Sequence, residues 1–245
     1  MRIQRKSYLY QLTFLPRTFP VNCYLVEEEK DLTLIDAALP YSAKGILGAA
    51  QRIGKPVTRI VLTHAHDDHV GALDKLKEVL PEAKVYISTR DARLFAGDRS
   101  LDPGESTEPI RGGVPSKLKT RPDVLLSEGD TVGSLRVIAA TGHTPGSIAL
   151  LDSRTGALIA GDAFQLRGGI AVSGQVRPLF PFPAWATWSS STSLRSAQKL
   201  RDLAPSLLAV GHGGMIESPV PAMDRAIQEA ARKLAGGQEG GGRHA

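Results

Sequence analysis

The sequence contains very little cysteine, with Cys23 as the single thiol among 245 residues. One cysteine cannot form an internal disulfide, so the composition does not require an oxidising compartment. Cys23 lies in a segment with strand character, which favours a buried structural thiol over a reactive one. No stretch of the sequence approaches the ~18 apolar residues of a membrane span. The basic first six residues are not followed by an apolar core and a cleavage site, as in a signal peptide. We therefore expect a cytoplasmic protein without a membrane partner.

Clusters of like charge are also missing, although the net charge is +5. The Lys and Arg residues are scattered along the chain, which argues against a nucleic-acid partner. The hydrophobic content of 42% and the charged content of 22% are typical of an ordinary soluble globular protein. We predict a single domain over residues 1–235, followed by a Gly-rich disordered tail over residues 236–245.

Apolar patterning predicts a strand-rich first third that passes into alternating strands and helices. In the first half, strands are expected over residues 8–14, 22–27, 32–35, 59–62 and 84–87, and helices over 41–52 and 71–80. In the second half, strands are expected over 135–140, 147–151, 158–160 and 207–210, and helices over 191–203 and 221–234. This rhythm implies a sheet with helices packed on one face. Two stretches, 96–122 and 165–190, fit no regular element and indicate functional or mobile loops.

The densest cluster of metal-binding side chains lies between the predicted strand 59–62 and a helix, and reads His64-Ala65-His66-Asp67-Asp68-His69. Residues two apart in an extended segment point to the same side, so His64 and His66 can reach one metal ion. Asp68 and His69 lie where the chain turns into the helix and can face a second ion. Imidazole and carboxylate ligands suit zinc, and also manganese or iron. A chance cluster of surface histidines is the alternative, and it leaves this crowding unexplained.

Three more candidate ligands follow predicted strands and lie beside glycine. His143 lies in a Thr-Gly-His-Thr-Pro-Gly turn, Asp162 in Gly-Asp-Ala, and His212 in Gly-His-Gly-Gly. Glycine lets the backbone approach a ligand closely. Each residue alone is equally consistent with a structural role. Four strand-end loops with the same ligand types are better explained by one shared site.

The order of these residues resembles the metallo-β-lactamase superfamily. Its signature is His-x-His-x-Asp-His, followed by a distant His, an Asp and a final His, and the resemblance covers about residues 8–234. It implies an α/β fold, the αββα sandwich, with the metal site at one edge of the two sheets. It also implies that Asp36, after an early strand, orients the site. We interpret Asp67 as structural because it points away from its neighbours in an extended chain.

The resemblance further implies a site for two divalent metal ions, with Zn²⁺ favoured and Mn²⁺ or iron as alternatives. The ligands that it implies are His64, His66 and His143 for the first ion, Asp68, His69 and His212 for the second, and Asp162 as the bridge. Two adjacent cations drive a bridging water toward hydroxide near neutral pH, and the hydroxide is the nucleophile. Asp68 and Asp162 are the candidate catalytic carboxylates, which orient the hydroxide or pass a proton to the leaving group.

We predict a hydrolase that uses this metal-bound hydroxide on the carbonyl of a small ester, lactone or thioester. A phosphodiesterase, a mononuclear iron sulfur dioxygenase and a non-catalytic metal-binding module are the alternatives. True β-lactamases of this fold usually lack the bridging Asp, so Asp162 argues against that activity. We see neither the C-terminal helical domain of glyoxalase II-like thioesterases nor the basic arm of RNase Z-like nucleases. Quorum-quenching lactonases share the ligand pattern, but several carry Tyr where this chain has Gln165.

The loop 165–190 offers a further indication of the substrate because it is rich in large apolar side chains. One interpretation is that it lines an apolar pocket, so that the partner is a small molecule with apolar character. The other is that it packs against the body of the protein or against the second subunit of a homodimer. Arg167 and Arg177 in this loop could meet an anionic group, although exposed arginines are common.

Overall fold

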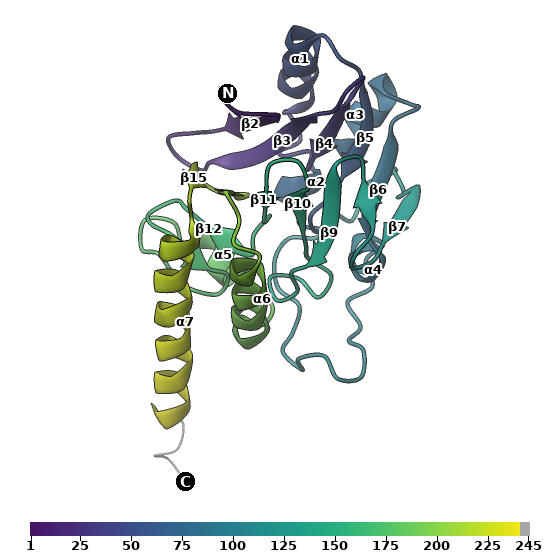
Figure 1. Cartoon of the computed structure of the whole chain (residues 1–245). Helices are drawn as coiled ribbons and strands as arrows, with labels where there is room; N and C mark the ends of the chain where they lie inside the picture. Colours follow the sequence, from purple (N-terminus) through teal and green to yellow (C-terminus); the bar gives the residue numbers. More distant parts are fainter. Residues whose placement is uncertain (241–245) are drawn as a thin grey trace.

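Two β-sheets face each other at the centre of the molecule (Figure 1). The computed structural model describes the backbone of residues 1–240 and the side chains of residues 1–236. The first sheet has the strand order β1-β2-β3-β4-β5-β6-β7, antiparallel from β1 to β4 and parallel from β4 to β7. Its strands are β1 (Arg2–Lys6), β2 (Leu9–Phe14), β3 (Val21–Glu27), β4 (Leu32–Ile35), β5 (Val57–Val61), β6 (Lys84–Ser88) and β7 (Val124–Leu126).

The second sheet has the strand order β15-β14-β11-β10-β9-β8, and only the β11–β14 pair is parallel. Its strands are β8 (Thr131–Val132), β9 (Leu135–Ala139), β10 (Ile148–Asp152), β11 (Ala157–Ile159), β14 (Leu207–Ala209) and β15 (Met215–Glu217). A separate two-stranded sheet pairs β12 (Phe164–Gln165) with β13 (Ala171–Val172). The candidate ligands all follow strands of the two large sheets.

Helices cover the outer side of each large sheet. On the first sheet these are α1 (Ala43–Ile53), α3 (Leu73–Val79) and α4 (Thr89–Phe95), and on the second α6 (Ser190–Asp202) and α7 (Val220–Gly240). The buried apolar residues accordingly form three clusters, one between the sheets and one beneath each helical layer. The predicted αββα sandwich is confirmed.

The alternation of apolar side chains explains why each sheet is buried on both faces. In β4, Leu32 and Leu34 contact the helical layer, whereas Ile35 belongs to the cluster between the sheets. In β10, Ile148 and Leu150 lie between the sheets, and their neighbours in sequence face the other way. Successive side chains of a strand point to opposite faces, so continuous apolar strands fill two layers at once.

Most predicted elements are confirmed, with ends shifted by at most two residues. The predicted helix 41–52 is α1, which ends at Gly54 because this residue adopts a left-handed conformation with φ of 83°. The predicted helix 71–80 is α3, and a separate short helix that was not predicted, α2 (Asp67–Val70), precedes it. The chain turns between them at Gly71, where a Cβ would lie 2.7 Å from the carbonyl oxygen of Ala38.

Several other elements differ from the prediction, and β7, β8, β15 and α4 were not predicted. Strand β1 was not predicted because all five of its side chains are exposed, so it shows no apolar alternation. The loop 165–190 contains β13 and the single turn α5 (Phe182–Trp185), which are too short to show a period. Helix α7 continues to Gly240, beyond the predicted end at residue 234 and through residues 236–240 of the predicted tail. The rest of that tail, 241–245 with His244, lies outside the described residues.

None of the helices within residues 1–240 combines the length and the apolar character that crossing a bilayer requires. The cytoplasmic location and the division into one domain and a tail stay predictions.

Buried polar side chains join the two sheets at one edge. Asn22 Nδ2 donates to the carbonyl oxygens of Val210 and Gly213, each at 2.8 Å. Tyr24 Oη donates to Val210 O at 2.6 Å and accepts from Gln11 Nε2 at 3.0 Å. Gln11, Asn22 and Tyr24 belong to the first sheet, and the carbonyls belong to the segment that follows β14 in the second. These bonds hold the end of β14 in a fixed position against β3.

We predict that Tyr24→Phe lowers the free energy of unfolding by about 1–2 kcal/mol, because buried hydrogen-bonding groups lose a partner. Tyr10→Phe is the matched control, since its hydroxyl lies 3.1 Å from Glu27 Oε2 in a half-buried position. The control should change the free energy by about 0.5 kcal/mol or less. Urea unfolding curves measure both variants. Equal losses of unfolding free energy in the two variants would show that the hydrogen bonds between the sheets stabilise the protein no more than a half-buried hydroxyl contact does.

Candidate metal centre

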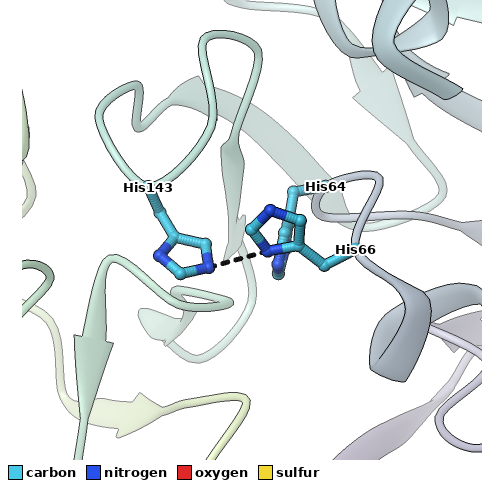
Figure 2. Close-up of side chains that lie close together, drawn as sticks. All are labelled: His64, His66 and His143. Atoms are coloured by element: carbon cyan, nitrogen blue, oxygen red, sulfur yellow. Dashed lines mark hydrogen bonds between the residues drawn. The ribbon is translucent and has the colours of Figure 1, made fainter. Parts of the chain in front are cut away.

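Three imidazoles meet at the edge of the sandwich. His64 and His66 follow β5, and His143 lies in the turn between β9 and β10. The chain at His66 is extended, with φ of −77° and ψ of 149°, so His64 and His66 project to one side. Figure 2 shows the three side chains close together, with His66 Nδ1 at 3.0 Å from His143 Nε2. One ring nitrogen from each lies within 4.8 Å of the others, a spacing that could hold a metal ion.

A second group lies beside the first. Asp68, His69 and His212 each offer one ligand atom, and these atoms also lie within 4.8 Å of one another. His212 follows β14, and its Nε2 lies 3.5 Å from Asp68 Oδ2. His69 is fully buried and Asp68 is partly exposed. This group is therefore the second possible metal position.

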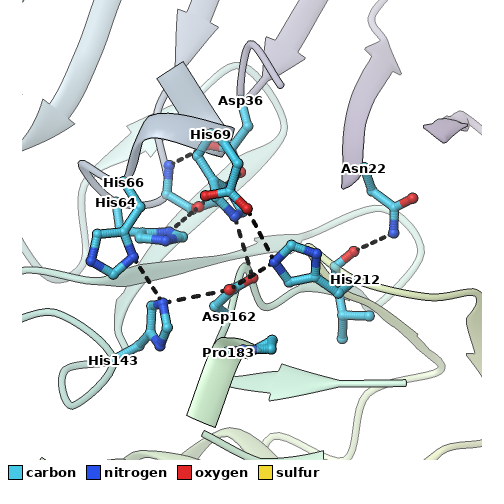
Figure 3. Close-up of polar contacts among 12 residues, drawn as sticks. Asn22, Asp36, His64, His66, His69, His143, Asp162, Pro183 and His212 are labelled. Atoms are coloured by element: carbon cyan, nitrogen blue, oxygen red, sulfur yellow. Dashed lines mark hydrogen bonds and ion pairs between the residues drawn. The ribbon is translucent and has the colours of Figure 1, made fainter. Parts of the chain in front are cut away.

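Asp162 lies between the two groups (Figure 3). Its Oδ2 is 3.4 Å from His143 Nε2 and 3.1 Å from His212 Nε2, and its Oδ1 is 3.4 Å from His69 Nε2. The carboxylate follows β11, which pairs in parallel with β14, so Asp162 and His212 leave the same edge of the sheet. One carboxylate that contacts imidazoles of both groups has the geometry of a bridging ligand.

Glycine makes this close approach possible. A Cβ at Gly211 would lie 2.0 Å from Asp162 Oδ1 and 2.7 Å from the His69 ring. A side chain at this position would therefore displace the carboxylate or the imidazole. This crowding explains the glycine that directly precedes His212.

The chemistry of the site fits metal ions. Among the described residues, His64 Nε2, His69 Nε2 and Asp162 Oδ1 are buried atoms without a hydrogen-bond partner. Buried polar atoms are normally satisfied, and leaving them unpaired is costly. His64 and His69 belong to the two groups and Asp162 lies between them, and each of the three atoms is of a type that binds zinc, manganese or iron. Cations at these positions would satisfy them.

Burial and charge divide the histidines into two classes. Burial lowers the pKa of His64 well below its ordinary value and lowers the pKa of His143 to about 3. Burial also opposes charge on His69 and His212, but nearby carboxylates together outweigh it and raise the pKa of both residues: Asp162, Asp36 and Asp68 at His69, and Asp162 and Asp68 at His212. The reverse holds for Asp162, whose pKa falls well below its ordinary value because His212 and His69 outweigh its burial. Neutral imidazoles are ready to donate a lone pair to a metal ion.

In three of the histidines, one ring nitrogen contacts a backbone or side-chain oxygen of another part of the chain. His66 Nε2 lies 3.1 Å from Arg111 O, and His212 Nδ1 lies 2.7 Å from Pro20 O. His143 Nδ1 lies 2.9 Å from Ser173 Oγ and 3.2 Å from Thr187 Oγ1. Such contacts fix the ring orientation and the tautomer of metal-binding histidines. Sequence reasoning missed these partners because they lie in loops without a motif, or are backbone carbonyls.

Asp36 and Asp67, the two aspartates not predicted as ligands, lie in different surroundings. Asp36 is buried and its Oδ2 lies 2.8 Å from both His69 Nδ1 and Thr63 Oγ1, while its Oδ1 accepts from Thr63 N at 2.8 Å. Asp67 is exposed, and its backbone N–H donates to Gly113 O at 3.0 Å. The structure thus brings Asp36 against the site and leaves Asp67 outside both ligand groups.

The loop 165–190 contributes both core and surface. Phe180 and Trp188 are buried, and Trp188 Nε1 donates to Glu108 O at 2.8 Å. Phe182 and Trp185 are 47% and 61% exposed, so they are available to a ligand. An aromatic wall, which we define as Phe19, Phe180, Phe182 and Trp185, lies beside His212, with ring centroids of Phe19 and Phe180 at 5.7 and 5.2 Å from that imidazole.

The two arginines of the loop are engaged by the protein. Both guanidinium nitrogens of Arg177 pair with Glu229 of α7 at 2.7 Å. Arg167 Nη2 donates to Arg17 O at 2.7 Å. A role in binding an anionic group is therefore not supported for Arg177, and the ion pair instead attaches the loop to α7.

The αββα sandwich thus carries at one edge two groups of imidazoles and carboxylates that could bind metals. The family model of the metallo-beta-lactamase superfamily matches residues 16–212. The chain belongs to this superfamily, and the predicted resemblance is confirmed.

Individual relatives agree with this placement. The uncharacterized protein YobT of Bacillus subtilis (strain 168) is 58% identical over 232 residues, which cover 95% of this chain and all of that protein. The probable metallo-hydrolase YflN of the same organism is 31% identical over 214 residues, covering 78% and 80%. The crystal structure of TTHA1623 in a di-iron-bound form is similar with a TM-score of 0.62 and 28% identity, covering 86% and 96% of the two chains.

We predict that Asp162→Asn lowers the affinity for metal ions at both groups by at least about tenfold, because an amide lacks the charge of a bridging ligand. Asp67→Asn is the control and should bind metal like the wild type, since Asp67 lies outside both groups. Elemental analysis after dialysis measures the number of metal ions that each variant retains per chain. The melting temperature with added metal should also fall for Asp162→Asn alone. A loss of equal size in both variants would contradict the assignment of the carboxylates.

Proposed function

We propose that the protein is a dinuclear metal-dependent hydrolase that acts on the carbonyl of a small ester, lactone or thioester. The observation that carries the proposal is the position of Asp162, which contacts His143 of one ligand group and His69 and His212 of the other. A bridging carboxylate between two triads is suited to hold two ions close together. The proposed catalytic residues are Asp68 and Asp162.

The first ion is assigned to His64, His66 and His143, and the second to Asp68, His69 and His212, with Asp162 between them. Zn²⁺ is the favoured ion because imidazole and carboxylate oxygen are its common ligands. Iron is the main alternative, since the similar TTHA1623 structure is described as di-iron-bound. Two such ions supply a nucleophile from water at neutral pH and polarise the oxygen of the bond to be broken.

The two carboxylates differ in access to solvent, and this difference suggests their roles. The side chain of Asp162 is 3% exposed, whereas that of Asp68 is 27% exposed. Asp162 is therefore suited to fix the geometry of the centre, because its contacts with three histidines hold the carboxylate in one position. Asp68 is suited to carry a proton between the centre and a leaving group at the open side.

Two apolar surfaces beside the ligands support a small substrate with apolar character. The aromatic wall lies against His212. On the same ligand group, a cavity of about 520 Å³ opens at Asp68. The cavity is lined by Leu39, Pro40, Asp67, Asp68, Gly71, Pro115, Ser116, Lys117 and Leu118. A volume of this size and a mainly apolar lining suit a small organic molecule.

The test is a substrate panel of lactones, thioesters and bis-aryl phosphodiesters with metal-loaded protein. The proposal expects the highest kcat/KM on one of the acyl compounds, and no turnover by His66→Ala, which loses a proposed ligand. A phosphodiester that is hydrolysed faster than every acyl compound would overturn the substrate class. Oxidation of a persulfide by protein with one iron per chain would instead establish the dioxygenase alternative.

We predict that Phe182→Ala or Trp185→Ala raises KM for a long acyl substrate by an amount equivalent to about 1–3 kcal/mol of lost binding. A short acyl substrate should be hydrolysed almost as before, because the ligand groups are unchanged. Leu179→Ala is the control, since Leu179 is 82% exposed in the same loop and takes no part in the aromatic wall. Equal losses on both substrates with a lowered melting temperature would show that the wall is structural.

A further inference from the structure

Asp91 is a buried carboxylate that lies outside every metal-binding motif. It belongs to α4 and is fully buried, yet no Lys or Arg within the described residues forms a salt bridge with it. Its Oδ2 accepts from Ala65 N at 2.9 Å and from Thr144 Oγ1 at 2.8 Å. Its Oδ1 accepts from Gly146 N at 2.8 Å. Three hydrogen bonds thus satisfy a buried charge that has no cationic partner.

The partners of Asp91 belong to the two loops that carry the first ligand group. Ala65 lies between His64 and His66, and Thr144 directly follows His143. The bond to Ala65 N fixes the extended backbone from which both imidazoles project. The bond to Thr144 Oγ1 fixes the start of the turn that presents His143. One carboxylate therefore sets the separation of all three imidazoles of this group.

The packing around Asp91 shows that the start of α4 is shaped for this contact. Ser88 caps the helix by accepting from Asp91 N at 3.0 Å, and its Oγ donates to Gly146 O at 2.6 Å. A Cβ at Gly146 would lie 2.3 Å from Asp91 N. Only glycine lets the turn of His143 approach the helix this closely. Asp91 is thus held rigidly in the position from which it contacts both loops.

Asp36 is the counterpart of Asp91 on the other side of the centre. It accepts hydrogen bonds from Thr63 and lies 2.8 Å from His69 Nδ1, so it supports the second ligand group. Asp91 has no recorded bond to that group, and Asp36 has none to His66 or His143. Asp36 thus contacts the second ligand group directly and the first through Thr63, whose Oγ1 lies 3.1 Å from His64 Nδ1, whereas the side-chain bonds of Asp91 go to the two loops of the first group.

We propose that Asp91 is the positioning residue of the first ligand group, and that it sets the affinity for the ion bound by His64, His66 and His143. The inference rests on the metal assignment of the proposed function and is independent of the substrate. Because Asp91 acts through two loops, its loss changes the spacing of three ligands without removing any of them.

The test is calorimetric titration of the metal-free protein with Zn²⁺. Asp91→Asn keeps the size of the side chain but sets an amide N–H against groups that donate. We expect the wild type to bind two ions, and Asp91→Asn to bind one with unchanged affinity and the other about 10–100-fold more weakly. Asp36→Asn is the matched comparison: because Asp36 contacts His69 directly and His64 only through Thr63, it should weaken the ion bound by Asp68, His69 and His212 more than the other ion.

Combined variants identify which ion is affected. In a His143→Ala background, where the first site is already damaged, adding Asp91→Asn should change the remaining affinity by less than about threefold, as expected for coupled residues. In a His212→Ala background, where the first site is intact, Asp91→Asn should lower the Zn²⁺ affinity by the same factor as in the wild type. Equal weakening of both ions by Asp91→Asn, or no weakening of either, would overturn the proposal.

Further measurements separate positioning from general stability. Thr144→Val removes one hydroxyl that donates to Asp91, and it should weaken the same single ion even if Asp91→Asn fails to fold. Melting curves with a chelator report the stability of the metal-free protein. A lowered melting temperature with both affinities unchanged would make Asp91 a purely structural residue. Fewer than two ions in the wild type would instead contradict the proposed function.

Discussion

The structure of the site depends on one buried carboxylate and the imidazoles around it. Asp162 is buried between His69, His143 and His212, with contacts of 3.1–3.4 Å. Burying a charge is costly unless opposite charges or cations compensate it. The imidazolium form of His69 and His212 can compensate part of this charge in the metal-free protein, which is why Asp162 raises their pKa. Two metal ions would compensate it more completely, and this requirement links the fold to the proposed chemistry.

The fold meets this requirement by fixing each ligand loop from outside. Asp36 and Asp91 hold the loops on the side of the first sheet, and the bonds from Asn22 and Tyr24 hold the segment of His212. These contacts join both sheets and α4 at the edge where the strands end. Rigid support of this kind determines the distances between ligands more precisely than a single flexible loop would allow.

The sandwich and the seven proposed ligands were predicted from the resemblance to the superfamily, which rests on the His-x-His-x-Asp-His motif and on three later residues beside glycine, and the structure brings these seven residues together. The sequence did not predict Asp91, since an isolated aspartate after a strand has no motif. Ser173 and Thr187 were missed for a similar reason, because they reach His143 from a loop whose path depends on tertiary packing. Local pattern specifies the ligands, whereas their supporting partners depend on contacts distant in sequence.

The central claim is that Asp162 bridges two metal ions, and a crystal structure of the protein grown with Zn²⁺ tests it directly. Anomalous diffraction recorded at the zinc edge locates each ion without reference to the protein coordinates. The account predicts two peaks on opposite sides of the Asp162 carboxylate, one ligated by His64, His66 and His143 and the other by Asp68, His69 and His212. A single peak, or two peaks that Asp162 does not join, would contradict it.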